Sequence, residues 1–191
     1  MILRTSLGRS FDGVGKYVLH DKGAQTNERV SFIERDNLAF DMPQEAIGEM
    51  IRTSRRQQDL KRRAGGRGTK TPKPVYHLSM SWDTRESPSL KEQMDAARSA
   101  LKALGLHDRQ AMIVGHTDTD NPHVHVVVNL VCPVTGKTAS LSNDQLKLSK
   151  WAQSYEEQRG LVFCKEREAN NAGRDFKFVK DQSLTRQEWV A

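Results

Sequence analysis

Two apolar segments joined by a short polar turn constrain the fold of this chain more than any other feature. AMIVG at 111–115 and HVHVVVNLV at 123–131 each predict a β-strand, and the polar stretch HTDTDNP lies between them. A parallel crossover needs a dozen or more residues, so a turn of this length favours antiparallel neighbours. We therefore expect a β-hairpin at the centre of the structure.

Strands and helices are also predicted on the N-terminal side of this hairpin. Residues 75–82 (VYHLSMSW) alternate between apolar and polar side chains, which predicts a strand with one buried face. Apolar residues at helical spacing predict helices at 43–56 and 90–104, and Gly105 ends the second.

On the C-terminal side, Ser142 and Gln145 form a capping-box pattern that predicts a helix ending near Arg159. Residues 161–164 (LVFC) predict one more short strand. Strands separated by amphipathic helices indicate an α+β fold, in which an antiparallel sheet carries flanking helices mostly on one face.

Length and composition favour one domain. The chain has 191 residues and a mass of 21.6 kDa. We assign residues 1–166 to the domain and treat the polar, weakly patterned residues 167–191 as a C-terminal extension, where a further region would start. No apolar run reaches the roughly 18–20 residues of a spanning helix, and no apolar signal segment opens the chain, so we expect a cytoplasmic protein without membrane insertion. Two cysteines, Cys132 and Cys164, are too few for a disulfide framework, and we expect buried free thiols.

Positive charge is concentrated in one segment. The formal net charge is +6, and residues 52–73 hold nine basic side chains against one acid, Asp59. This segment ends in GGRGTKTPKP, which we interpret as a flexible arm. A basic arm suits a polyanion, and we expect nucleic acid, because each neutralised phosphate releases condensed counterions. The basic residues are Arg52, Arg55, Arg56, Lys61, Arg62, Arg63, Arg67, Lys70 and Lys73.

Three histidines in and around the central turn predict a metal site. Side chains at i and i+2 of a strand share a face, so His123 and His125 point the same way, about 6–7 Å apart. His116 ends the preceding strand and can reach that face across the turn. Together they predict a three-nitrogen metal site with open coordination positions.

The same turn carries two carboxylates, Asp118 and Asp120, which can accept the second N–H of a ligating histidine and fix its tautomer. Imidazole ligands favour zinc, manganese, nickel or cobalt over magnesium, and the residues alone leave the metal open. Next to a segment that binds a polyanion, such a metal would polarise a phosphodiester oxygen.

A phosphodiester reaction also needs a nucleophile, and Tyr17 is a candidate. Tyr76 lies on the apolar face of its predicted strand and Tyr155 within a helical pattern, so packing roles are expected for both. Tyr17 lies in GVGKYVLHDKG beside Lys16 and His20, and close cations or a base would help a phenol of pKa about 10 to ionise. Ordinary packing stays open for Tyr17 at this point.

These segments resemble a known family. HTDTDNPHVHVVVN resembles the third motif of conjugative relaxases, the plasmid mobilisation nucleases of the HUH endonuclease superfamily, and is most similar to the P-type clan that includes the nuclease of T-DNA borders. KYVLHDKG resembles their first motif, which carries a tyrosine nucleophile. HLSMSW at 77–82 resembles their second, in which a serine contacts DNA beside the scissile phosphate. The motifs occur in the family's order over residues 17–129.

The resemblance implies an HUH relaxase-like fold with a five-stranded antiparallel sheet, and a transesterification. Tyr17 would attack the scissile phosphate, leaving a free 3′-OH and a 5′-phosphotyrosyl link to the protein. His116, His123 and His125 would bind a divalent cation, Mg²⁺ or Mn²⁺ in relatives, although other transition metals suit three imidazoles. His116 is also a candidate base for the tyrosine.

Further roles follow from the second and third motifs. Asp118 and Asp120 both fit the acidic positions, and we favour Asp120. Ser81 matches the serine of the second motif better than Ser79 does. His77 lies on the same strand face, so all three residues of this strand are expected to contact DNA.

The resemblance further implies site- and strand-specific nicking and rejoining at an origin of transfer, for conjugation or mobilisation of a plasmid or integrative element. The substrate would be single-stranded or locally melted DNA, because the scissile phosphate must enter the metal site. Partners would be auxiliary relaxosome proteins and a secretion-system coupling protein, in a bacterial cytoplasm from which the protein can travel with the DNA to a recipient cell. Relatives often carry C-terminal helicase, primase or secretion-signal regions, so we expect one domain of a longer protein.

Three other functions stay open. A rolling-circle replication initiator belongs to the same superfamily, but commonly has its motifs in the opposite order. A metal-dependent phosphodiester hydrolase would use water and form no covalent intermediate. A non-catalytic DNA-binding module would use the basic segment alone and would be indifferent to chelators.

Overall fold

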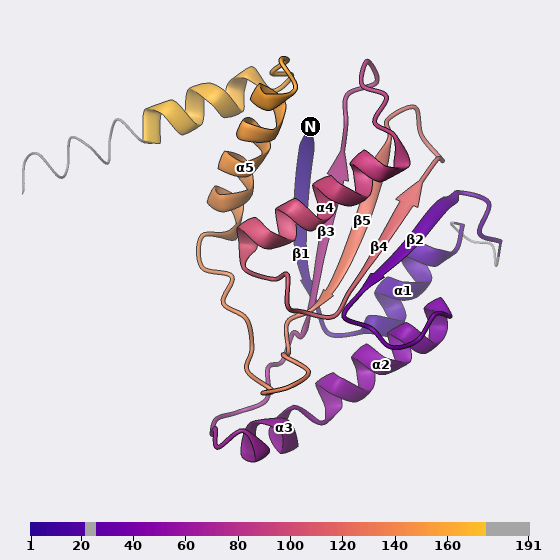
Figure 1. The fold of residues 1–191 in the computed structure, drawn as a ribbon, viewed down its shortest axis with the longest axis vertical. Helices are drawn as coiled ribbons and strands as arrows, with labels where there is room; N and C mark the ends of the chain where they lie inside the picture. The colour runs from indigo at the N-terminus through magenta and orange to yellow at the C-terminus, as the bar shows by residue number, and fades with distance from the viewer. Residues whose placement is uncertain (22–25, 175–191) are drawn as a thin grey trace, which may run out of the picture.

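The computed structural model describes residues 1–21 and 26–174 (Figure 1). Its elements follow in the order β1 (Ile2–Gly8), α1 (Phe11–Leu19), β2 (Val30–Asp36), α2 (Pro43–Arg55), α3 (Gln57–Arg63), β3 (Val75–Ser81), α4 (Leu90–Leu104), β4 (Ala111–His116), β5 (His123–Asn129) and α5 (Asp144–Gln158). A further helix occupies residues 165–174.

The strands form one five-stranded antiparallel sheet in the order β1-β3-β5-β4-β2. β4 and β5 form the predicted hairpin, and β5 is the central strand. The predicted α+β class with a sheet of about five strands is therefore confirmed. The two edge strands, β1 and β2, and helix α1 were not among the predicted elements.

Helices cover both faces of the sheet, so the prediction that most of them lie on one face is wrong. α4 and α5 pack on the face that carries Leu78 and Val126. α1 and α2 pack on the opposite face, against Met112, Val114 and Val127. Figure 1 shows α4 in front of the strands, and α1 and α2 toward the β2 edge. A second apolar layer is possible because β5 is apolar at Val127 as well as at the valines of its other face.

Helix α4 forms as predicted. Ser89 and Glu92 make a reciprocal capping box at its start, and Gly105 ends it with a φ of 71°. α5 differs from the prediction, because Ser142 does not cap it. Asn143 occupies the N-cap position, with a φ of 58°, and its side chain makes no capping hydrogen bond. The Ser142 N–H donates to Ser140 Oγ.

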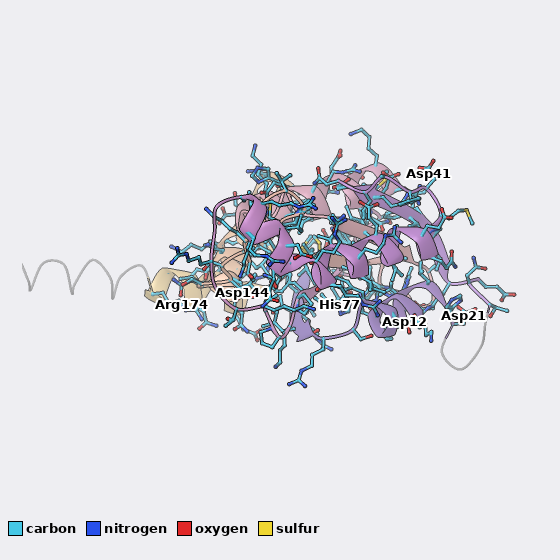
Figure 2. The ribbon with its side chains drawn as sticks, turned by 90° about the horizontal axis from the view of Figure 1, so that it is seen from below. Asp12, Asp21, Asp41, His77, Asp144 and Arg174 are labelled. Carbon is cyan, nitrogen blue, oxygen red and sulfur yellow. The ribbon has the colours of Figure 1, made fainter. Side chains whose placement is uncertain are left out.

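The C-terminal part also differs from the prediction. Residues 161–164 are not a strand, but connect α5 to the helix at 165–174, and Cys164 N donates to buried Glu156. This helix docks on α5 through Asn171, which is 3% exposed and accepts from Ser149 Oγ at 2.9 Å. The predicted boundary after residue 166 falls inside it, and residues 175–191 of the predicted extension lie outside the described residues. Figure 2 shows Arg174 at the opposite side of the molecule from Asp21 and Asp41.

Two further sequence expectations concern cysteines and membranes. Cys132 and Cys164 are free thiols, the first buried and the second partly exposed. Within residues 1–21 and 26–174, no helix has the length and apolar character needed to cross a membrane.

Candidate metal centre and nucleic-acid interface

The β4–β5 hairpin brings the three histidines together. His116 at the end of β4 pairs directly with His123 at the start of β5, and His125 follows on the same face. One ring nitrogen from each can be chosen so that all three atoms lie within 4.8 Å of one another. His116 and His125 are only 3% and 6% exposed. The predicted cluster of three imidazoles is therefore present in the structure.

The hydrogen bonds of His116 fix which of its nitrogens can bind a metal. Its Nε2 lies 2.8 Å from the carbonyl oxygen of Val18. Because a carbonyl only accepts, Nε2 carries the hydrogen and Nδ1 keeps a lone pair. This Nδ1 atom is buried without a hydrogen-bond partner. A buried, unpartnered lone pair is the arrangement expected of a ligand atom.

His123 and His125 also use one nitrogen each in a protein contact. Nδ1 of His123 lies 3.0 Å from the carbonyl oxygen of Asn121, which leaves Nε2 as the lone-pair atom. Nδ1 of His125 lies 2.9 Å from Nε2 of His77. When His125 Nδ1 is the donor in this contact, its Nε2 keeps the lone pair and can bind a cation. The donor set thus fits a divalent cation held by three imidazole nitrogens.

Burial keeps His116, His125 and His77 in the neutral form, the form in which an imidazole binds a metal. It lowers the pKa of His125 to about 3, and the neighbouring His116 and His77 add to this effect. Burial also lowers the pKa of His116 and of His77. At neutral pH no proton therefore has to leave His116 or His125 before a cation binds.

The two carboxylates of the turn are placed differently. Oδ1 of Asp118 lies 3.3 Å from Nε2 of His123, on the side of its ligand atom. Burial raises the pKa of Asp118, but the bond from Arg29 and the nearby His123 outweigh it, and the net shift is downward. Asp120 is exposed and makes no hydrogen bond or ion pair with any described residue. The preference for Asp120 over Asp118 is therefore not supported by the geometry.

Tyr17 lies at the edge of the histidine cluster. Its side chain comes from α1, is 55% exposed, and meets the rings of His125 and His77 edge-on at centroid distances of 5.5 and 5.9 Å. Its expected cationic neighbour Lys16 pairs with Asp12 instead, at 3.1 Å. By contrast, Tyr76 is buried and Tyr155 accepts a bond from Trp82, in agreement with packing roles.

Sequence reasoning missed Arg29, the cation that does lie beside Tyr17. Its guanidinium lies over the Tyr17 ring at 5.6 Å, donates to the Tyr17 carbonyl, and donates to Asp118 at 3.3 Å. The side chain is 11% exposed. No local pattern marks this arginine, because its two partners are 12 and 89 residues away.

A cavity of about 440 Å³ opens beside the cluster. Ser79 and Ser81 of β3, which the sequence predicts to contact DNA, line this cavity. Ile2 and Arg4 of β1 line it as well, and sequence reasoning missed both. His77 does not line this cavity, because its ring is turned toward His125. The complete lining is Ile2, Arg4, Tyr17, Arg29, Ser79, Ser81, Asp118, Thr119, Asn121, His123 and His125.

The basic segment lies elsewhere and is more ordered than predicted. Its first part is the end of α2 and all of α3, so only residues after Arg63 form a loop. That loop enters β3 at Val75, whereas the cavity is at Ser81, about 20 Å away for a strand of this length. None of the nine basic residues lines the cavity.

The chain is similar to a known protein family and to two curated proteins. A family model described as "Relaxase: MobA/VirD2-like, nuclease domain" matches residues 17–161. Protein MobA of Acidithiobacillus ferrooxidans is 36% identical over 69 residues, which is 36% of this chain and 17% of MobA. Protein TraI of Escherichia coli is 32% identical over 130 residues, which is 67% of this chain and 16% of TraI. The matched parts thus span about one sixth of the length of these curated relatives.

A solved structure shares the fold. It was reported as "Molecular Basis of Vancomycin Resistance Transfer in Staphylococcus aureus", and its TM-score with this chain is 0.50. The match covers 84% of this chain and 94% of the other, at 12% sequence identity. At this identity the likeness concerns the arrangement of the sheet and helices.

Proposed function

The chain belongs to the relaxases, as a nuclease domain of the MobA/VirD2-like type, and we propose that it nicks and rejoins one DNA strand at an origin of transfer through Tyr17. The observation that carries this proposal is the contact between the exposed ring of Tyr17 and His125 of the three-histidine cluster. A phenol at this position can reach a phosphate that enters the adjoining cavity.

In the proposed reaction the Tyr17 hydroxyl attacks the scissile phosphorus. A bond forms between Tyr17 Oη and phosphorus, the bond from phosphorus to the 3′-oxygen breaks, and that oxygen leaves as a free 3′-OH. The 5′-phosphotyrosyl link conserves the energy of the broken phosphodiester bond, so the reverse step rejoins the strand without another energy source.

His116, His123 and His125 would hold the divalent cation, with Asp118 beside His123. When bound, such a cation supplies Lewis-acid stabilisation of charge that develops on the phosphate oxygens. Mn²⁺ and Mg²⁺ are the ions we propose, although the nitrogen donors also suit other transition metals.

The geometry favours a ligand role for His116 over a base role. Its free nitrogen is the buried Nδ1, and the rings that touch Tyr17 are those of His125 and His77. Arg29 is suited to orient Tyr17 and to add positive charge where the phosphate would sit. Ser79 and Ser81, which line the cavity, would contact the DNA.

The proposal includes the form of the DNA substrate, the partner proteins and the location in the cell. The DNA would be single-stranded or locally melted, because the scissile phosphate must enter the metal site beside Tyr17. Auxiliary proteins that open the duplex and a coupling protein of a secretion system would be the partners, in the cytoplasm of a bacterium.

The test is a denaturing gel of the purified protein with labelled single-stranded DNA from the transfer region of the element that encodes it. With Mn²⁺ or Mg²⁺, label on the 3′-side product should migrate with the protein, and both EDTA and Tyr17→Phe should remove that band. Tyr76→Phe is the matched control and should retain it. Cleavage that survives Tyr17→Phe without a protein-linked product would instead indicate a hydrolase.

A further inference from the structure

The basic segment is fastened to the body of the domain by one buried glutamine. Gln57 begins α3 and is completely buried. Its Nε2 donates to the Gly136 carbonyl at 3.0 Å and to Thr138 Oγ1 at 2.9 Å, and its Oε1 accepts from Thr71 N at 2.8 Å. A single side chain therefore joins α3, the loop before β3 and the turn after β5.

Gly136 is shaped for this contact. It has a φ of 67°, and a Cβ atom there would lie 2.6 Å from the Gln57 carbonyl oxygen and 2.8 Å from Lys61 N. Any side chain would push α3 away from the turn, because both neighbours are backbone atoms. The close approach of the two backbones thus depends on the absence of a side chain.

The loop after α3 is also folded back on its own helix. Lys61 Nζ donates to the Thr69 carbonyl at 2.7 Å, and Gly66 N donates to the Lys61 carbonyl at 2.8 Å. Together with the bond from Thr71 to Gln57, these contacts hold both ends of the loop. We call the unit formed by residues 55–73 the basic platform.

The platform presents unbalanced positive charge. Arg62 pairs with Asp59, the only acid in the segment. Several other cations are exposed and form no ion pair within the part of the chain that the structure describes. They are Arg55, Arg56, Arg63, Arg67, Lys70 and Lys73. Cations that are held at fixed positions and lack acidic partners favour binding of a polyanion whose charges lie along a matching path.

β5 connects this platform rigidly to the histidine cluster. His123 and His125 occupy one end of the strand, and the turn that contains Gly136 follows the other end. Near that end, buried Asn129 donates to the Met50 carbonyl of α2 at 3.2 Å and to Gln110 at 3.0 Å. The platform and the cluster are thus attached to the two ends of one central strand, about 20 Å apart.

We propose that Gln57 is a positioning residue that holds the basic platform as a second DNA contact at a fixed distance from Tyr17. This inference rests on the proposed function, because it takes the DNA strand that enters the cavity as the polyanion. Backbone phosphates some 20 Å along that DNA would meet the platform on one side of the nick. A docked platform increases the binding affinity only for DNA that is long enough to reach it. A loose arm would increase the affinity with little dependence on the length of the DNA.

The experiment compares a series of oligonucleotides extended stepwise in the 5′ or the 3′ direction from the nick. Wild-type protein should show a step in affinity, of about tenfold at low salt, once the DNA reaches the platform on one side. Gln57→Ala should abolish the step while leaving affinity for the shortest oligonucleotide and for Mn²⁺ unchanged. Gly136→Ala should act in the same way, and Gln58→Ala, an exposed neighbour, is the matched control.

Limited trypsin digestion reports on docking independently of DNA. Gln57→Ala should speed cleavage between residues 61 and 73, with a thermal unfolding curve that remains cooperative. The inference is overturned if trypsin cleaves the variant no faster, if wild type shows no step, or if a step persists in a variant whose loop is released. Binding with a step that depends on Gln57, but without strand cleavage, would refute the proposed function and leave this inference standing.

Discussion

Nε2 of His77 lies 2.9 Å from Nδ1 of His125, and the two rings stack at a centroid distance of 5.1 Å. The contact joins neighbouring strands β3 and β5 diagonally. His77 pairs directly with Val127, which lies two residues after His125 on the same face of β5. His77 thus contacts a candidate ligand of the metal. Residues in this position orient the ligating ring and fix its tautomer.

His77→Ala should therefore weaken Mn²⁺ binding by about 10–100-fold, the usual effect of removing such a partner. The measurement is isothermal titration with Mn²⁺ after EDTA treatment and dialysis. Ser79→Ala is the matched control on the same face of β3, and its Mn²⁺ affinity should stay close to that of wild type. Equal affinities of the His77 variant and wild type would show that His125 does not depend on this contact.

Asp118→Asn and Asp120→Asn should separate the two carboxylates of the turn. Asp118 lies 3.3 Å from both His123 and Arg29, whereas Asp120 points into solvent. We expect Asp118→Asn to lower the cleavage rate about 10–100-fold, as for other residues around a metal. Asp120→Asn should change it less than about threefold, since exposed substitutions have small effects. Single-turnover cleavage at saturating Mn²⁺ checks both, and the reverse order would restore the preference for Asp120.

The sequence predicted the centre of this site because its signals are local. Alternation along β5 and a turn of six residues (117–122) place His116 opposite His123, whichever way the rest of the chain folds. Alternation in β3 likewise places His77 on the face of His125. Arg29 carries no such signal, since its role depends on a contact with Asp118 that is distant in sequence.

Helix α1, which was not predicted, and the basic segment, which was predicted to be flexible, both depend on contacts between residues that are distant in sequence. α1 contains Gly13 and Gly15, which lower helix propensity, and forms because Ser10 caps it and because Gly15 lets Ile47 of α2 approach closely. The basic segment has the glycines and prolines of a flexible loop. It is nevertheless held by Gln57, whose partner at Gly136 is 79 residues away.

Arg29→Gln should slow cleavage about 10–100-fold, because it removes the charge beside Tyr17 and Asp118 while keeping a polar side chain. Arg29→Lys should fall between this variant and wild type, since an ammonium group keeps the charge but not the planar fork. Mn²⁺ affinity should change much less than the cleavage rate. A parallel loss of Mn²⁺ affinity would show that the arginine acts by supporting the metal site. Arg35→Gln on β2 is the control.

Stability of the metal-free domain should fall as the pH drops below about 6.5. Burial lowers the pKa of His125 to about 3, and the pKa values of His116 and His77 are also lowered, whereas unfolding restores values near 6.5. Between these values the unfolded chain binds more protons, so acidification favours unfolding. Thermal unfolding in EDTA from pH 8 to pH 5 should show a falling midpoint. His125→Gln should flatten this dependence, and an unchanged slope in that variant would assign it to other groups.

Gly115→Ala should destabilise the fold and the metal site together. Gly115 precedes His116 and lies opposite Phe32, where the pairing of β2 with β4 is irregular. A Cβ atom there would overlap the Phe32 ring and lie 2.6 Å from Ser31 Oγ. Because that ring packs against the core, we expect a loss of about 1–3 kcal/mol in the free energy of unfolding, with weaker Mn²⁺ binding through the displaced His116.

Gly13→Ala provides the matched comparison, because its Cβ would make only ordinary contacts with Ser10, the nearest of them at 3.4 Å. In a helix this change should raise stability by about 0.5–1 kcal/mol. Urea unfolding with and without Mn²⁺ measures both variants. If Gly115→Ala is as stable as wild type, β2 is able to move away from β4 without disturbing His116, and the close packing at this edge does not hold the histidine in place.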